Sequence, residues 1–275
     1  MALFAPLLRF IRHRLARGVP YGLGFTLAFG VIVGALWGFL EVIDAIYDQD
    51  DVARFDASAH DTLYQALGAD RGLGVAVTWF GNNTTLIAFV VIVAAGLALA
   101  KRYWAAFRVV FASGVGGLVV LGLKSLFARD RPLEQVIPAH GYSLPSGHAF
   151  ASTVFYGMMI YLVWRLTERR WARVLATVLG VAMIAAVGLS RVYLNVHYLT
   201  DVLAGWLSGT AWLAASLLLV DIIETRTRSR VERREERARP SDAEPQSHPT
   251  IDGPRGGRTT RSVGRGTAKH SGPER

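Results

Sequence analysis

The sequence predicts an all-helical polytopic membrane protein in which six transmembrane helices form a bundle. Two observations support this expectation. Hydrophobic residues make up 52% of the 275 residues, and the mean hydropathy is positive. Apolar runs of about 18 or more residues recur along the chain, and a helix of that length can cross a hydrocarbon core of roughly 30 Å.

Six apolar runs are long enough to be spans, and we expect the residues between them to form loops. The first run follows several arginines, as in a secretory signal peptide. It is too long for the apolar core of a cleaved signal, however, and therefore predicts an uncleaved helix. The predicted spans cover residues 20–43, 84–100, 105–124, 147–165, 172–190 and 198–222.

The positive charges predict how the bundle is oriented. Residues 101–108 and 165–173 are short basic connections, whereas the 44–83 segment is rich in aspartate. Lys and Arg in short loops favour the cytoplasmic side of a membrane. We therefore expect both termini in the cytoplasm of a bacterium and, on the outer side of its inner membrane, the loops 44–83, 125–146 and 191–197.

Composition divides the chain into three parts. A basic cytoplasmic segment covers residues 1–19, the membrane domain covers 20–222, and a basic cytoplasmic tail covers 223–275. The tail is rich in Arg, Glu, Ser, Pro and Gly and cannot bury a core, so we expect it to be disordered. The formal net charge of +9 lies in loops and tail rather than on a folded face, which argues against a nucleic-acid partner.

Small residues and the lack of cysteine add two further points. Gly30, Gly34 and Gly38 recur at a spacing of four in the first span, a pattern that lets two helices approach closely in lipid. Their neighbour could be another helix of the bundle or a second copy of the chain, so a homodimer remains open. Because the chain has no cysteine, disulfides, thiolate metal sites and thiol catalysis are excluded.

Polar residues recur where the predicted spans reach the outer side. Charged groups are costly near a bilayer unless they face water, a partner or a substrate. A folded bundle would bring the outer ends of its helices together, so we expect these residues to form one site. They are Lys124, Arg131, Ser146, Gly147, His148, Arg191, His197 and Asp201.

These residue types suit the chemistry of a phosphate group. Lys124, Arg131 and Arg191 can donate to its oxygens, and arginine can do so in bidentate geometry. Ser146 and Gly147 open a predicted helix, whose free amides favour an anion. One histidine could attack phosphorus while another protonates the leaving oxygen.

His197 and Asp201 are four residues apart and therefore share one face of a helix. Asp201 can hold one ring nitrogen of His197 and leave the other free to attack. That assignment makes His148 the acid.

The chain resembles the type 2 phosphatidic acid phosphatase superfamily, which also includes vanadium haloperoxidases, and the resemblance covers about residues 80–215. Three motifs carry it. The first runs from Lys124 to Arg131-Pro132, the second is Pro145-Ser146-Gly147-His148, and the third is Ser190-Arg191 followed by His197 and Asp201.

The resemblance implies hydrolysis of a lipid phosphate without metal or other cofactor, through a phosphohistidine. It implies that His197 is the nucleophile, His148 the general acid and Asp201 the orienting carboxylate. It also implies a phosphate-binding cradle, formed by Lys124, Arg131, Ser146, Gly147 and Arg191.

Several functions remain compatible with these motifs. The lipid could be phosphatidic acid, phosphatidylglycerol phosphate or an undecaprenyl-type diphosphate. A phosphotransferase of the same fold and a non-catalytic anion-binding transporter are the alternatives, whereas a haloperoxidase would need a large soluble domain. Outside the motifs, we interpret Arg129 and Asp130 as a solvated loop pair, His140 as a loop residue, and Asn82-Asn83 as a helix start or loop.

Overall fold

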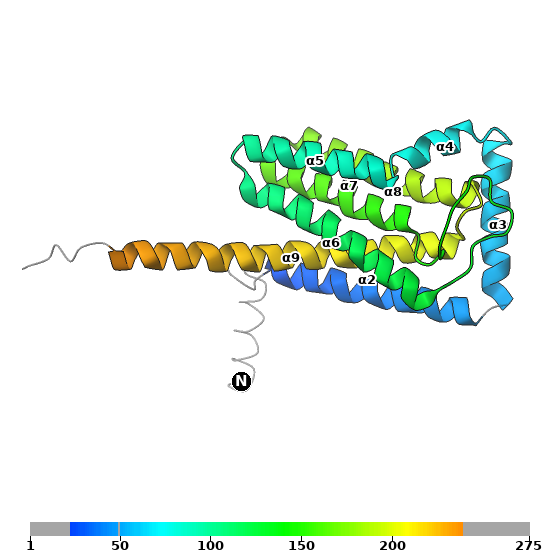
Figure 1. The fold of residues 1–275 in the computed structure, drawn as a ribbon, viewed down its shortest axis with the longest axis horizontal. Coiled ribbons are helices and arrows are strands. Elements are labelled where there is room, and N and C mark those ends of the chain that lie inside the picture. Colours follow the sequence, from blue (N-terminus) through cyan, green and yellow to red (C-terminus); the bar gives the residue numbers. More distant parts are fainter. Residues whose placement is uncertain (1–22, 49, 239–275) are drawn as a thin grey trace, which may run out of the picture. The chain divides into compact units, whose positions relative to one another are not determined.

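The computed structural model describes residues 23–48 and 50–238, and all regular structure in these ranges is helical. The fold expected from the sequence is thereby confirmed. The helices are α2 (Leu23–Tyr47), α3 (Asp50–Leu67), α4 (Gly72–Trp79), α5 (Asn83–Leu99), α6 (Tyr103–Phe127), α7 (Gly147–Leu166), α8 (Arg170–Tyr193) and α9 (Leu199–Ala238) (Figure 1).

Six segments of the described chain are long and apolar enough to cross a membrane, and the protein is an integral membrane protein. Five of them are α2, α6, α7, α8 and most of α9. The other is Gly72–Leu99, in which the short α4 leads into α5, so this span begins earlier than the sequence predicts. Asn82 separates the two helices and caps α5 by accepting a hydrogen bond from the Thr84 amide, as a helix start requires.

Helix α7 lies at the centre of the bundle, and eight of its residues, among them Phe150 and Met158, are buried. Two glycines on α9 let the backbones of α7 and α9 approach closely. A Cβ on Gly205 would lie 2.7 Å from the Ser146 carbonyl oxygen, and one on Gly209 would lie 3.0 Å from the Phe150 carbonyl oxygen. This contact fixes the start of α7 against the first turns of α9.

The segment expected to be a loop, residues 44–83, contains the helices α3 and α4. That expectation was wrong because α3 is amphipathic: Val52, Asp56, His60 and Leu63 recur at helical spacing and face the protein. Leu63 packs against the buried Tyr193 and Leu194. In Figure 1, α3 crosses the end of the bundle where α2 ends and α9 begins.

Helix α9 continues to Ala238, so the disorder expected for residues 223–238 is not found there. Arg and Glu are good helix formers, and pairs one turn apart, such as Glu224 with Arg228 at 2.5 Å, add support. Arg108 on α6 also pairs with Asp221 and Glu224. The remaining tail (239–275) and the basic N-terminal segment (1–19) lie outside the described residues.

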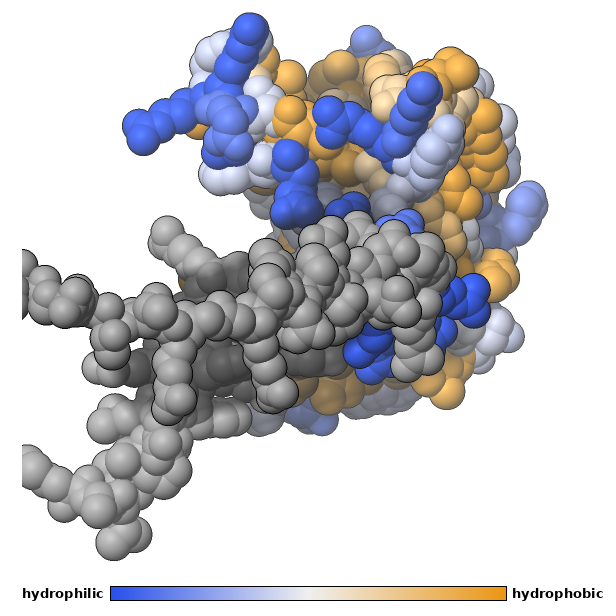
Figure 2. Space-filling view, turned by 90° about the vertical axis from the view of Figure 1, so that its left-hand side faces the viewer, coloured by the Kyte–Doolittle hydropathy of each residue, from blue (hydrophilic) through white to orange (hydrophobic). Residues whose placement is uncertain are grey.

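The surface of the bundle matches a membrane setting. Figure 2 looks at the end of the bundle opposite α3 and shows hydrophilic side chains around that end beside broad apolar surface. The connections there carry exposed cations at Lys101, Arg102, Arg169 and Arg170. Large apolar side chains such as Trp37 and Leu118 are more than 60% exposed along the spans, where lipid would cover them.

Candidate active site

The structure gathers the motif residues at one end of the bundle. Lys124 lies in the last turn of α6, Arg191 lies in the last turn of α8, and Arg131 belongs to the loop that leads into α7. Backbone hydrogen bonds join these pieces: the Ser146 amide donates to the Asp201 carbonyl at 2.9 Å, and the His197 amide donates to the Arg191 carbonyl at 3.3 Å. The site is therefore built on the backbone that connects the spans.

Three cations in this region are held by neutral oxygen atoms. The ammonium of Lys124 donates to the Tyr142 carbonyl at 2.6 Å, and Arg131 donates to the Gly141 and Val196 carbonyls at 2.8 Å each. Arg191 donates to the Thr78 hydroxyl at 2.7 Å. None of the three forms an ion pair within the described part of the chain. Their charges can therefore act on an anion.

Two buried polar atoms beside these cations lack a hydrogen-bond partner among the described residues: the Ser146 hydroxyl and Nε of Arg191. An unsatisfied buried polar group costs about 1–3 kcal/mol. A Cβ on Gly147 would lie 3.6 Å from Cε of Lys124, so the start of α7 adjoins the lysine side chain. An anion at this point would meet donors that currently have no acceptor.

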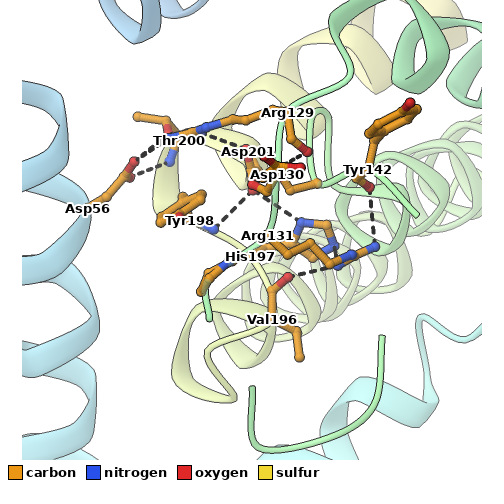
Figure 3. Close-up of polar contacts among 12 residues, drawn as sticks. Asp56, Arg129, Asp130, Arg131, Tyr142, Val196, His197, Tyr198, Thr200 and Asp201 are labelled. Carbon is orange, nitrogen blue, oxygen red and sulfur yellow. Dashed lines mark hydrogen bonds and ion pairs between the residues drawn. The ribbon is translucent and has the colours of Figure 1, made fainter. Parts of the chain in front are cut away.

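The ring of His197 has different neighbours on its two nitrogens (Figure 3). Nδ1 lies 3.3 Å from Oδ2 of Asp201, which also accepts from the Tyr198 amide at 3.0 Å, and Nε2 lies 3.1 Å from Nη1 of Arg131. A guanidinium can only donate, so Nε2 must accept and Nδ1 must carry the proton. This tautomer presents a lone pair at Nε2.

Burial lowers the pKa of His197 to about 4, against an ordinary value of 6.5. The hydrogen bond and charge of Asp201 oppose this change in pKa, and the charges of Arg131 and Lys124 add to it. Burial also lowers the pKa of the Arg131 guanidinium, which nevertheless stays charged because arginine does not lose its proton in proteins. At neutral pH, His197 is consequently an uncharged imidazole beside a cation.

His148 is the second residue of α7 and is partly buried. Its ring lies within electrostatic range of His197 and of all three cations, and a Cβ on Gly81 would lie 3.3 Å from its Cδ2 atom. The structure thus brings the eight predicted site residues, which come from all three motifs, to one region.

Four residues outside the predicted set also contact the site. Thr78 on α4 accepts from Arg191. Arg129 forms an ion pair with Asp201 at 2.7 Å and with Asp56 at 3.1 Å, and Thr200 lies between them (Figure 3). The interpretation of Arg129 and Asp130 as a solvated pair was therefore wrong for Arg129. The partners of Arg129 are distant in sequence, and no local sequence pattern predicts them.

Two hollows adjoin these residues. A cavity of about 600 Å³ lies between α2, α3 and His197, with Asp56, Arg129 and Leu144 in its wall. A second, more apolar groove of about 510 Å³ lies between α5, α6 and α7, and Lys124 and Gly147 are among the residues that line it. The groove thus connects Lys124, one of the three cations, with the membrane-spanning surface of three helices.

The fold and this site define a class: helical integral membrane proteins in which the ends of the spans hold a histidine–aspartate pair beside a cluster of cations. Residues 105–223 match the family model of the PAP2 superfamily. This region of the chain is thus similar to the PAP2 superfamily, the one that its motifs resemble.

Two curated relatives have names that state a function. Phosphatidylglycerophosphatase B of Bacillus subtilis is 30% identical over 135 residues, which are 48% of this chain and 66% of that protein. Undecaprenyl-diphosphatase of Sulfolobus acidocaldarius is 38% identical over 116 residues, 39% of this chain and 50% of that protein. The chain thus spans only about half to two thirds of the length of these relatives.

A solved structure shares the fold. The crystal structure of a transmembrane PAP2-type phosphatidylglycerolphosphate phosphatase from Bacillus subtilis superposes with a TM-score of 0.63 and 24% identity. The match covers 71% of this chain and 96% of the other. It extends the likeness beyond the region that the family model matches.

Proposed function

We propose that this protein is a membrane-bound lipid phosphatase that hydrolyses a phosphate monoester or a diphosphate carried on a lipid. One observation carries the proposal: Lys124, Arg131 and Arg191 converge beside the lone pair at Nε2 of His197, and no carboxylate of the described residues pairs with them. The names of the two curated relatives, both phosphatases of lipid phosphates, support the same class of reaction.

The position of the site favours a lipid over a soluble phosphate ester. A lipid phosphate can place its headgroup at the ends of the spans while its tail remains among apolar side chains. The groove between α5, α6 and α7 offers such a path, because it extends from Lys124 and Gly147 along the spans. Phosphatidylglycerol phosphate and an undecaprenyl-type diphosphate head the candidates, followed by phosphatidic acid.

The first chemical step transfers the phosphoryl group to His197. The lone pair at Nε2 forms a bond to phosphorus, and the bond between phosphorus and the lipid oxygen breaks. The lipid oxygen leaves with that electron pair and takes a proton from His148. As the ring of His197 becomes cationic, Asp201 stabilises it through Nδ1, and the three cations neutralise the phosphoryl oxygens.

The second step releases phosphate. A water molecule attacks phosphorus and gives a proton to His148, and the electron pair of the breaking N–P bond returns to Nε2. His148 regains the proton that it lost, so the cycle consumes one water. The negative charge of a bound phosphate favours the protonated form of His148 before the first step, because it offsets the surrounding cations.

Side-chain cations supply the charge that a metal ion would otherwise provide, so the proposal needs no cofactor. We therefore expect turnover to continue in EDTA, and we expect vanadate to inhibit by occupying the cradle of Lys124, Arg131, Ser146, Gly147 and Arg191.

Purified protein and a panel of substrates test the proposal. Phosphate release in EDTA should occur with phosphatidylglycerol phosphate, phosphatidic acid or an undecaprenyl diphosphate, and it should be far slower with glucose phosphate. Transfer to an added alcohol instead of water would identify a phosphotransferase. Absence of phosphate release from every lipid would contradict the proposal. Anion transport that is unaltered in His197→Ala would then favour an anion transporter.

The proposed dimer is a separate matter. A Cβ on Gly38 would lie 3.3 Å from the Leu207 side chain of α9, so this glycine packs inside the bundle. Gly30 and Gly34 have no other described atoms within 4 Å of such a Cβ. A homodimer through that face stays a prediction, which crosslinking of Gly30→Cys protein in lipid would test.

A further inference from the structure

Asp56 on α3 lies outside all three motifs, yet it is only 3% exposed. Helix α3 is otherwise a polar helix with several exposed acids, including Asp51 and Asp61. Burial of a carboxylate is costly unless it is paired and hydrogen-bonded. The partners that the fold gives to Asp56 therefore indicate what it does.

Those partners belong to the site. Oδ1 of Asp56 accepts from the Thr200 amide at 2.9 Å, and Oδ2 accepts from the Thr200 hydroxyl at 2.7 Å and from Nη2 of Arg129 at 3.1 Å (Figure 3). The other terminal nitrogen of Arg129, Nη1, donates to Oδ1 of Asp201 at 2.7 Å and to the Thr200 hydroxyl at 2.8 Å. One guanidinium thus bridges two buried carboxylates, and the second carboxylate holds His197.

We propose that Asp56 is a positioning residue for the His197–Asp201 pair, acting through Arg129 and Thr200. Arg129 fixes Oδ1 of Asp201, which leaves Oδ2 to face Nδ1 of His197. Asp56 in turn holds the far side of Arg129. This role rests on the proposed function, since it concerns the step in which His197 attacks phosphorus.

The charges explain why a second carboxylate is needed. Arg129 and Asp201 alone form a neutral pair, so the aspartate would do little for the cationic ring that forms on His197. Asp56 shares the guanidinium, and the cluster of two carboxylates and one arginine keeps a formal charge of −1. Because the cluster is largely buried, water screens that charge weakly, and it can stabilise the ring.

Docking of α3 does not depend on Asp56 alone. Nδ1 of His60 lies 2.9 Å from the Val192 carbonyl, and Leu63 packs against Tyr193 and Leu194. Asp56→Asn also keeps the size and shape of the side chain. We therefore expect this variant to fold, and the neutral amide to impair the chemical step rather than binding of the lipid.

Single-turnover kinetics test the proposal, with enzyme in saturating excess over lipid labelled on its phosphate. The rate constant then reports chemistry at competent sites and does not depend on the fraction of folded protein. Asp56→Asn should slow this step about tenfold or more, an effect comparable to the loss of a partner behind a metal-bound histidine, while KM in steady state stays near the wild-type value. The matched control is Asp61→Asn, an exposed acid on the same helix beside the same cavity; it should react at the wild-type rate.

A double variant tests the route through Arg129. If Asp56 acts through Arg129, adding Asp56→Asn to Arg129→Gln should slow the reaction little further, whereas independent effects would multiply. A rate constant for Asp56→Asn within about twofold of wild type, which is the scatter of independent sites, would overturn the proposal. So would multiplied effects in the double variant, or failure to recover any folded Asp56→Asn protein. An inactive wild type would instead refute the proposed phosphatase.

Discussion

At the scale of single residues, the unusual feature is a buried histidine between an anion and a cation. Asp201 takes the proton-bearing side of His197, and Arg131 lies at the side with the lone pair. Solvent-exposed histidine is partly protonated near pH 6.5, whereas the pKa of His197 falls to about 4 through burial. In the proposed mechanism, His197 is thus uncharged at neutral pH and can attack phosphorus through Nε2.

This arrangement predicts a measurable protonation state. At pH 6, ¹⁵N spectra of the histidine side chains should show His197 as a neutral ring protonated at Nδ1, identified by its absence in His197→Gln. Protonation should begin only as the pH approaches about 4. Because the unfolded chain binds this proton already near pH 6.5, the folded protein should lose stability as the pH falls from about 6.5 toward 4. A doubly protonated ring at pH 6, or the Nε2–H tautomer, would contradict the assignment.

The sequence could predict the members of this site but not all of their partners. His197 and Asp201 are one helical turn apart, and the three motifs can be read directly from the sequence. Asp56 and Thr200 are 144 positions apart in the chain; Asp56 lies outside the motifs, and Thr200 is an unspecified position within the third. Their contact depends on how α3 docks, which is a tertiary fact without a local signal.

At the scale of elements, the apolar runs predicted the spans well because length and composition alone decide them. The connections between the spans were harder. Helix α3 has the periodicity of an amphipathic helix, which the sequence displays, but its charged residues concealed it among the loops. The extension of α9 to Ala238 depends on side-chain pairs such as Glu224 with Arg228 rather than on apolar residues.

The contact between α7 and α9 gives a prediction at this scale. Gly205→Ala would place a Cβ 2.7 Å from the Ser146 carbonyl and 2.9 Å from the Ala149 Cβ, and backbone cannot yield easily. We expect a loss of about 1–3 kcal/mol in unfolding free energy, as in other overpacked cores, and slower phosphate release because Ser146 moves. Thermal unfolding in detergent measures the first effect.

The control uses the same substitution where there is room. A Cβ on Gly117 of α6 would have no described atom within 4 Å apart from its own helix, so Gly117→Ala should leave stability unchanged or raise it slightly. Equal unfolding temperatures and activities for Gly205→Ala and wild type would show that the close approach of α7 and α9 affects neither stability nor phosphate release.

At the scale of the whole molecule, the two ends of the bundle carry different groups of residues. One end carries exposed cations in short connections, and the other carries the candidate active site beneath α3. The basic connections at the first end favour its placement in the cytoplasm. The site would then face outward, where it would meet headgroups in the outer leaflet.

Single cysteines in this cysteine-free chain test the orientation. Leu133 is fully exposed in the loop before α7, and Arg169 is exposed between α7 and α8. In intact cells, a membrane-impermeant thiol reagent should label Leu133→Cys and spare Arg169→Cys until the cells are opened. Labelling of Arg169→Cys alone would show that the topology is the reverse of the predicted one.

The most direct test of the central claim is rapid-quench labelling with a lipid whose phosphate carries ³²P. We predict a transient protein-bound label that is acid-labile and base-stable, maps to His197, forms in EDTA, and disappears together with turnover in His197→Ala. Continued hydrolysis by His197→Ala, or a label on another residue of the wild-type protein, would contradict the account.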